Sequence, residues 1–79
     1  MTKHQLIEIA VETFWHNTAD GQSIDTANNE YTIFDDHTTV AKYFLLDNAT
    51  GITKKFNDIE RLFTKLPKEI IAQFIAYYE

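Results

Sequence analysis

The chain has 79 residues, no cysteine and a formal net charge of −5, from twelve acidic and seven basic side chains. A chain of this length buries only about 60% of the surface that its unfolded form exposes, so we expect one domain, residues 1–79, without a deep substrate pocket. The absence of cysteine excludes disulfides and sulfur-ligated metals and favours a reducing compartment. Because residues 1–5 begin no apolar run of signal-peptide length, we expect a cytoplasmic protein that does not enter a membrane.

Charge is divided unevenly along the chain. Residues 1–41 carry seven acids and one base, whereas residues 42–79 carry five acids and six bases. Such asymmetry indicates the kind of partner better than it indicates a fold, and a negative first half repels nucleic acid and anionic membrane surfaces. The alternative is that a moderate negative charge only keeps a small protein soluble.

A helix is predicted from Lys3 to Asn17. Thr2 and Gln5 have the spacing of a capping box, and apolar residues from position 6 to position 15 follow the helical repeat. Glu8 and Glu12, with His16 one turn further on, form a narrow polar stripe that should face water.

The next segment, residues 17–29, is polar and is predicted to be a loop. Ile24 is its only large apolar residue, so we expect this side chain to fix the loop to the core. One interpretation is that the loop presents Asp20 and Asp25 beside the sheet edge. The other is that it is a solvated connection.

Three runs of β-branched and aromatic residues follow, at Glu30 to Phe34 or Asp35, Thr39 to Leu46 and Ile52 to Phe56. They predict a three-stranded antiparallel meander whose last strand is an edge. The middle run also fits a short helix, but its β-branched start and the turn signal after it favour a strand. Both faces of the first two strands carry apolar side chains, so this sheet requires helices on both faces, a partner surface or a dimer.

Two helices are predicted after the sheet. Asn57 and Glu60 have the spacing of a second capping box, and a helix of two turns should bury Ile59, Leu62, Phe63 and Leu66. Pro67 ends that helix and begins the last one, which extends to Tyr78 and is apolar over most of its circumference. The predicted fold class is therefore α+β, with an N-terminal helix, a three-stranded antiparallel meander and two C-terminal helices.

Catalytic and metal chemistry finds little support in the sequence. His4, His16 and His37 lie on three different predicted elements and lack the spacing of metal ligands. Asp35 and Asp36 are neighbours at a predicted hairpin tip, where their carboxylates should point apart into water and stay unsuited to acid–base catalysis. With two glycines and one serine, the chain also has no phosphate-binding loop or serine nucleophile motif. We therefore expect a non-enzymatic protein without metal or cofactor.

Basic residues and an aromatic alternate in the second half of the chain, from Lys54 to Lys68. Acidic residues lie among them, and a nucleic-acid-binding domain is normally basic overall. We interpret this strip as a solvated, salt-bridged surface and expect no direct contact with nucleic acid.

The segment Phe34-Asp35-Asp36-His37-Thr38, set in a small acidic chain of helix, hairpin and helix, resembles the hairpin region of small phage-encoded anti-CRISPR proteins. Some of those proteins mimic DNA and occupy the DNA-binding surface of a CRISPR effector complex. The resemblance implies an inhibitor in the cytoplasm of a host bacterial cell, bound to a basic, nucleic-acid-binding surface of a CRISPR effector. The acidic residues predicted to contact this partner are Glu8, Glu12, Asp20, Asp25, Glu30, Asp35 and Asp36.

A second hypothesis from the residues is a small regulatory or interaction module that forms homo-oligomers, such as a homodimer. A terminal helix that is apolar over most of its circumference suits self-association. The aromatic residues predicted to make these contacts are Trp15, Tyr43, Phe74, Tyr77 and Tyr78.

Overall fold

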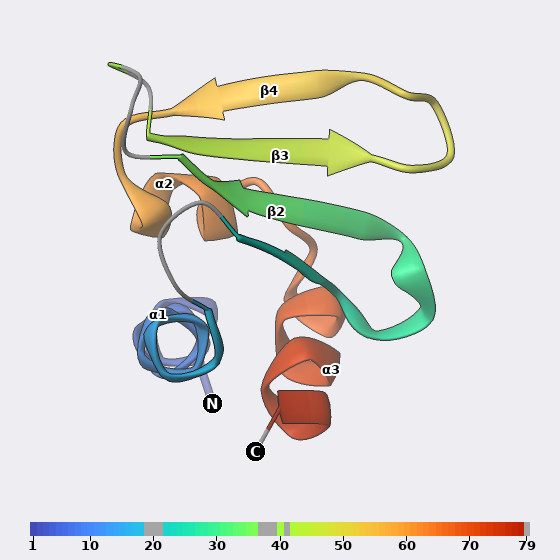
Figure 1. Ribbon diagram of the computed structural model, residues 1–79. Helices are drawn as coiled ribbons and strands as arrows, with labels where there is room; N and C mark the ends of the chain where they lie inside the picture. The colour runs from blue at the N-terminus through green and yellow to red at the C-terminus, as the bar shows by residue number, and fades with distance from the viewer. Residues whose placement is uncertain (19–21, 37–39, 41, 79) are drawn as a thin grey trace.

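The computed structural model describes residues 1–18, 22–36, 40 and 42–78 (Figure 1). It is an α+β fold in which four antiparallel strands form one sheet in the order β1-β2-β3-β4, and the helices lie against one face of that sheet. The elements are α1 (Lys3–Asn17), β1 (Ser23–Asp25), the short 3-10 helix η1 (Ala27–Asn29), β2 (Tyr31–Asp35), β3 (Tyr43–Asp47), β4 (Thr53–Phe56), α2 (Ile59–Thr64) and α3 (Lys68–Tyr78).

The first helix has the predicted bounds and the predicted cap. The backbone N–H of Gln5 donates to the Thr2 hydroxyl at 3.2 Å, and the Gln5 side-chain oxygen accepts from the Thr2 N–H at 2.8 Å. This reciprocal pair satisfies two donors that a helix start leaves unpaired. One side of α1 is buried through Ile7, Ala10 and Phe14, which join the core beneath the sheet.

The strand β1 was missed by the sequence analysis, which predicted three strands. Ile24 pairs with Ile33 of β2, and both side chains are buried. The expectation that Ile24 fixes this segment to the core is therefore confirmed, although it does so as part of a strand. A three-residue strand with a single apolar residue has no alternation to detect, so its pairing with β2 decides its structure.

The second and third predicted strands are confirmed with shorter bounds. The middle strand was expected to begin at Thr39 but begins at Tyr43. Val40, which precedes the strand, is 91% exposed. Residues 39 and 41 lie outside the described residues. Pairing of Tyr43–Asp47 with β2 excludes the helical alternative for that part. The strand β4 ends the sheet order and is an edge, as predicted.

The C-terminal helices bury the side chains that the sequence indicated, but the cap of α2 differs. Asp58 is the N-cap residue and accepts from the Glu60 N–H at 3.0 Å, so the predicted capping box on Asn57 is wrong by one residue. Leu62, Phe63 and Phe74 are fully buried, and the rings of Phe63 and Phe74 lie 5.3 Å apart. These helices and α1 form the second layer of the fold.

Candidate protein-binding surfaces

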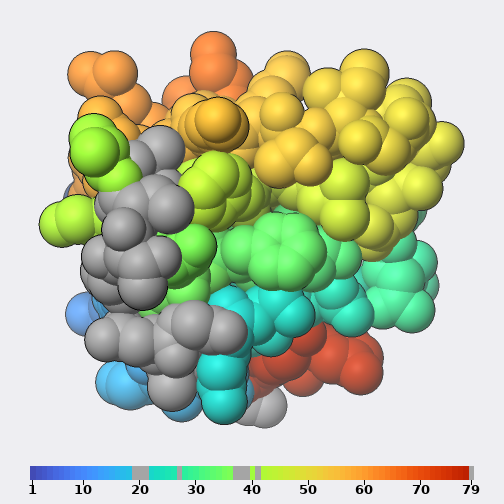
Figure 2. Space-filling view, turned by 45° about the horizontal axis from the view of Figure 1, so that its top comes forward, coloured from blue at the N-terminus to red at the C-terminus, as the bar shows by residue number. Residues whose placement is uncertain are grey.

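The face of the sheet opposite the helices is called here the outer face. In a strand, successive side chains point to opposite faces. Ile33 and Leu45 are buried on the helix side, so Phe34, Phe44 and Leu46 lie on the outer face. Phe34 is 37% exposed, and Phe44 and Leu46 are half-buried. The described helices all lie on the other side of the sheet, and Figure 2 turns the outer face toward the viewer.

Three of the predicted partner-binding acids lie on or beside this outer face. Asp25 pairs with Thr32, whose hydroxyl donates to the Asp25 carboxylate at 2.7 Å. The N–H of Asp36 donates to the Lys42 carbonyl at 2.7 Å, which continues the ladder and directs the Asp36 side chain to the same face as Phe34. Glu30 is exposed immediately before β2. Acidic groups thus border the apolar centre on its β1–β2 side, whereas Lys55 of β4 lies opposite Phe44 on the other side.

Glu8 and Glu12 do not lie on this face. Glu8 and Glu12 are exposed on the side of α1 that points away from its buried residues Ile7 and Phe14, so they lie in the helical layer. Glu8 lies 3.1 Å from His4, one turn earlier in the helix. The position of Asp20 is outside the described residues. The acidic residues of the first half therefore belong to at least two separate surfaces.

Asp35 corrects the expectation of an exposed acidic hairpin tip. The strand β2 extends through Asp35, so alternation turns this side chain to the helix side with Ile33. Asp35 is only 2% exposed, and it cannot contribute an accessible carboxylate in this conformation. His37, which follows them in the sequence, lies outside the described residues.

The five predicted self-association aromatics also separate into core and surface. Tyr43 and Phe74 are 6% and 0% exposed and belong to the core, so the expectation that they make intermolecular contacts is wrong for this conformation. Trp15 is 43% exposed, with its ring edge against Tyr43 at 5.9 Å between centroids. Tyr77 is 68% exposed.

Tyr78, the fifth aromatic, connects α3 to the sheet. Its hydroxyl donates a short hydrogen bond to the Asp25 carbonyl on β1, and the side chain is half-buried. Burial raises the pKa of the Tyr78 phenol above 10.0, with further contributions from the nearby Tyr77 and Asp25. Tyr78 is thus a structural contact between the two layers.

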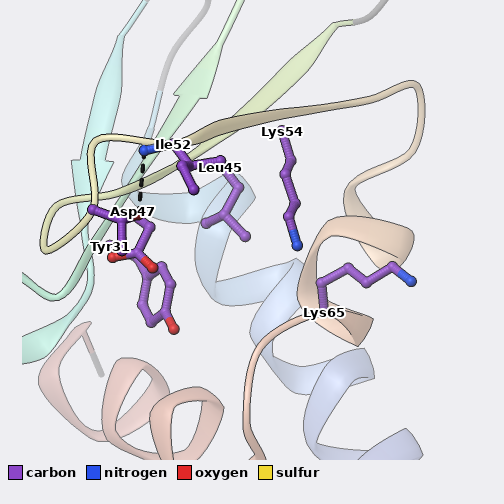
Figure 3. Close-up of a pocket in the computed structure, with 7 residues that line it drawn as sticks. Tyr31, Leu45, Asp47, Ile52, Lys54 and Lys65 are labelled. Atoms are coloured by element: carbon purple, nitrogen blue, oxygen red, sulfur yellow. Dashed lines mark hydrogen bonds between the residues drawn. The ribbon is translucent and has the colours of Figure 1, made fainter.

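A cavity of about 180 Å³ lies beneath the β3–β4 hairpin, next to the end of α2 (Figure 3). Its apolar wall includes Leu45 and Ile52, and its charged groups are Asp47, Lys54 and Lys65. The Asp47 carboxylate also accepts from the Ala49 N–H at 3.0 Å, which holds the turn between the strands. Among the described residues, no three His, Cys, Asp or Glu side chains are grouped as metal ligands would be.

The basic strip of the second half is solvated, but it is not salt-bridged. Lys54, Lys55, Arg61 and Lys65 are all exposed, and the ion pair found in the described part of the chain is the one between His4 and Glu8. The expected neutralisation by neighbouring acids therefore does not occur at these four positions.

The residues that sequence reasoning left out of the site are Phe34, Phe44 and Leu46. The sequence did contain a signal for them, because the alternation of side chains in the strands placed apolar residues on both faces of the sheet.

None of the helices in the described residues is long and apolar enough to cross a membrane. Comparisons with protein-family models, curated proteins and solved structures find no match to this chain.

Proposed function

We propose that this protein is a non-catalytic binding protein that attaches to a partner protein through the outer face of its sheet. The observation that carries the proposal is the open apolar centre of Phe34, Phe44 and Leu46, which the helical layer leaves uncovered. Apolar side chains grouped on an open face and rimmed by polar residues are typical of protein-interaction sites.

The partner should present basic groups around an apolar contact. A standard interface buries about 800 Å² on each partner, and this chain exposes 4917 Å² in total. Three partly buried apolar side chains supply too little area, so the interface must extend to the rim, where Asp25, Glu30 and Asp36 lie. Carboxylates at the rim raise association rates with a basic partner and select against acidic ones.

A CRISPR effector with a basic, nucleic-acid-binding surface is the partner class that fits the hairpin resemblance. In this form of the proposal, the protein is an inhibitor that competes with nucleic acid for that surface. The acids on the outer face supply the negative charge, whereas Glu8 and Glu12 of α1 lie on another surface and supply little to the same contact.

The test is a binding assay with purified CRISPR effector complexes, with and without their nucleic acid. Reversal of two outer-face charges, Asp25→Lys with Asp36→Lys, should weaken binding by roughly tenfold or more and lower its salt dependence. The matched control, Glu8→Lys with Glu12→Lys, changes the net charge equally on the helical layer and should have a much smaller effect. An equal or larger effect of the control would move the contact to α1 and refute the outer-face assignment.

Self-association is the second candidate, because the same uncovered apolar centre suits a second copy of the chain. Sedimentation velocity over a range of protein concentrations distinguishes self-association from binding to a different partner protein. A dimer that Phe34→Lys dissociates would favour the homo-oligomeric module, and a monomer at high concentration would count against it.

A further inference from the structure

The edge strand β4 has backbone groups that no other described residue pairs with. The Asp47 N–H donates to the Ile52 carbonyl at 2.9 Å, so Asp47 and Ile52 form a hydrogen-bonded pair of the antiparallel ladder. Such pairs alternate with non-bonded pairs along the ladder. The N–H and C=O of Thr53 and Lys55 therefore point away from β3, outward from the sheet. At the opposite edge, the Asp25 carbonyl of β1 already accepts from Tyr78.

A groove follows the edge of β4 beside α2. It consists of the cavity of Figure 3 and two further hollows, one of which shares lining residues with the cavity and with the other hollow. Lys65 lines both the cavity and the next hollow, and Phe56 and Arg61 line both of the others. The groove thus lies between the open edge of β4 and the exposed side of α2.

This groove is a basic site on an acidic protein. Lys54, Lys55, Arg61 and Lys65 line it, which is four of the seven bases of a chain with net charge −5. Within the described residues none of the four forms an ion pair. Two acids also line the groove: Asp58 at one end, where its carboxylate accepts from the Glu60 N–H, and Asp47 at the other, where its carboxylate accepts from the Ala49 N–H.

We propose that an acidic, extended segment of another protein binds along β4 as a fifth strand. Its backbone would pair with the outward N–H and C=O groups of Thr53 and Lys55, which is the mode of strand addition at a sheet edge. Side chains of the added strand alternate between the two faces. An acid on the helix side meets Arg61 and Lys65 across the groove, and an acid on the outer side meets Lys55.

The occupant is a peptide because the site offers two kinds of contact together. Lysine and arginine side chains alone would attract any polyanion. The unpaired edge requires a partner that both donates and accepts along an extended backbone, and a peptide strand does so at the spacing of this ladder. The phosphate backbone of a nucleic acid has acceptors but no matching donors.

The experiment measures fluorescence anisotropy of a short labelled peptide rich in glutamate, threonine and valine. The groove variant is Lys55→Glu with Arg61→Glu, and the matched control is Lys42→Glu with Lys68→Glu, which makes the same charge change at two lysines that do not line the groove. All four side chains are exposed, so both variants should fold, and circular dichroism checks this. We expect the groove variant to lose roughly tenfold or more in affinity and the control less than about threefold.

A second peptide separates strand pairing from charge attraction. Methylation of every backbone nitrogen in the central part of the peptide removes donors from both of its edges and leaves the peptide charge unchanged, so affinity should fall by roughly tenfold, corresponding to one or two lost hydrogen bonds. Equal binding of the methylated peptide would overturn the proposal, as would equal losses in the groove and control variants. Displacement by a single-stranded oligonucleotide more readily than by unlabelled peptide would also overturn it. Phe34→Lys should leave peptide binding intact, so this result stands apart from the outer-face proposal.

Discussion

Alanine substitution of the neighbours Ile33 and Phe34 tests which face of the sheet is packed. Ile33 is fully buried on the helix side, whereas Phe34 is 37% exposed on the outer face. Truncation of a buried isoleucine to alanine costs about 2–5 kcal/mol, because the lost transfer energy adds to that of the cavity left behind. Phe34→Ala leaves no closed cavity, since water can enter from the open side.

The expected loss of stability on Phe34→Ala follows from the side-chain area that Phe34 buries. A phenylalanine side chain has about 200 Å² to bury, and 37% of Phe34 remains exposed. The buried remainder, about 125 Å² at about 25 cal/mol per Å², sets an upper limit of about 3 kcal/mol. Alanine retains part of this area, and the unfolded chain already buries some of it, so we expect a loss of about 1–2 kcal/mol.

Urea unfolding of the two variants measures these losses. Trp15 serves as the reporter, since its ring contacts Phe14 and Tyr43 in the core. Equal m-values would show that the midpoints can be compared directly. Ile33→Ala should cost more than Phe34→Ala although phenylalanine is the larger side chain. The reverse order would show that the outer face is packed in the free protein and would refute the assignment of the faces.

Three further predictions concern the cap, one turn and one phenol. Thr2→Ala should lower the free energy of unfolding by about 1 kcal/mol, because it removes the acceptor for the Gln5 N–H, and thermal unfolding measures this loss. Gly51 has φ of +75° with open space around its Cα, so Gly51→Ala should cost roughly 1 kcal/mol from the backbone alone, and Gly51→Asn should cost less in the same urea assay. The pKa of Tyr78 is raised in the folded protein, so the stability that its neutral phenol contributes should be fully present below about pH 10 and should be lost as pH rises through the folded pKa. Urea unfolding at several pH values should therefore show a smaller decrease in the free energy of unfolding over that range for Tyr78→Phe than for the unsubstituted protein.

The helices were predictable because local signals determine their ends and their buried faces. The capping box at Thr2 and the repeat of apolar residues gave α1 its correct bounds. The strand β1 was not predictable in this way, since Ser23–Asp25 has one apolar residue and acquires its structure from pairing with β2. Whether a short segment forms a strand depends on the strand it pairs with as much as on its own residues.

The candidate site was predictable only in part, for a geometric reason. The sequence showed that acids are concentrated in residues 1–41, but the face on which each one lies depends on how α1 packs and where β2 ends. The strand β2 includes Asp35, so this residue lies with Ile33 on the helix side and Asp36 lies on the outer face. Because side chains in a strand alternate between its two faces, two neighbouring carboxylates expected together at an exposed tip are divided between the core and the outer face.

Because of the strand order, the uneven distribution of charge along the sequence becomes an uneven distribution of charge across the sheet. Because the strands lie side by side in chain order, Asp25 of β1 lies at one edge, and Lys54 and Lys55 of β4 lie at the other. Three strand spacings separate the edges by about 14 Å. The Debye length at physiological ionic strength is about 8 Å, so charges at one edge are largely screened from the other. The two edges can therefore attract partners of opposite charge without neutralising each other, and this is the physical basis for two separate binding surfaces on so small a chain.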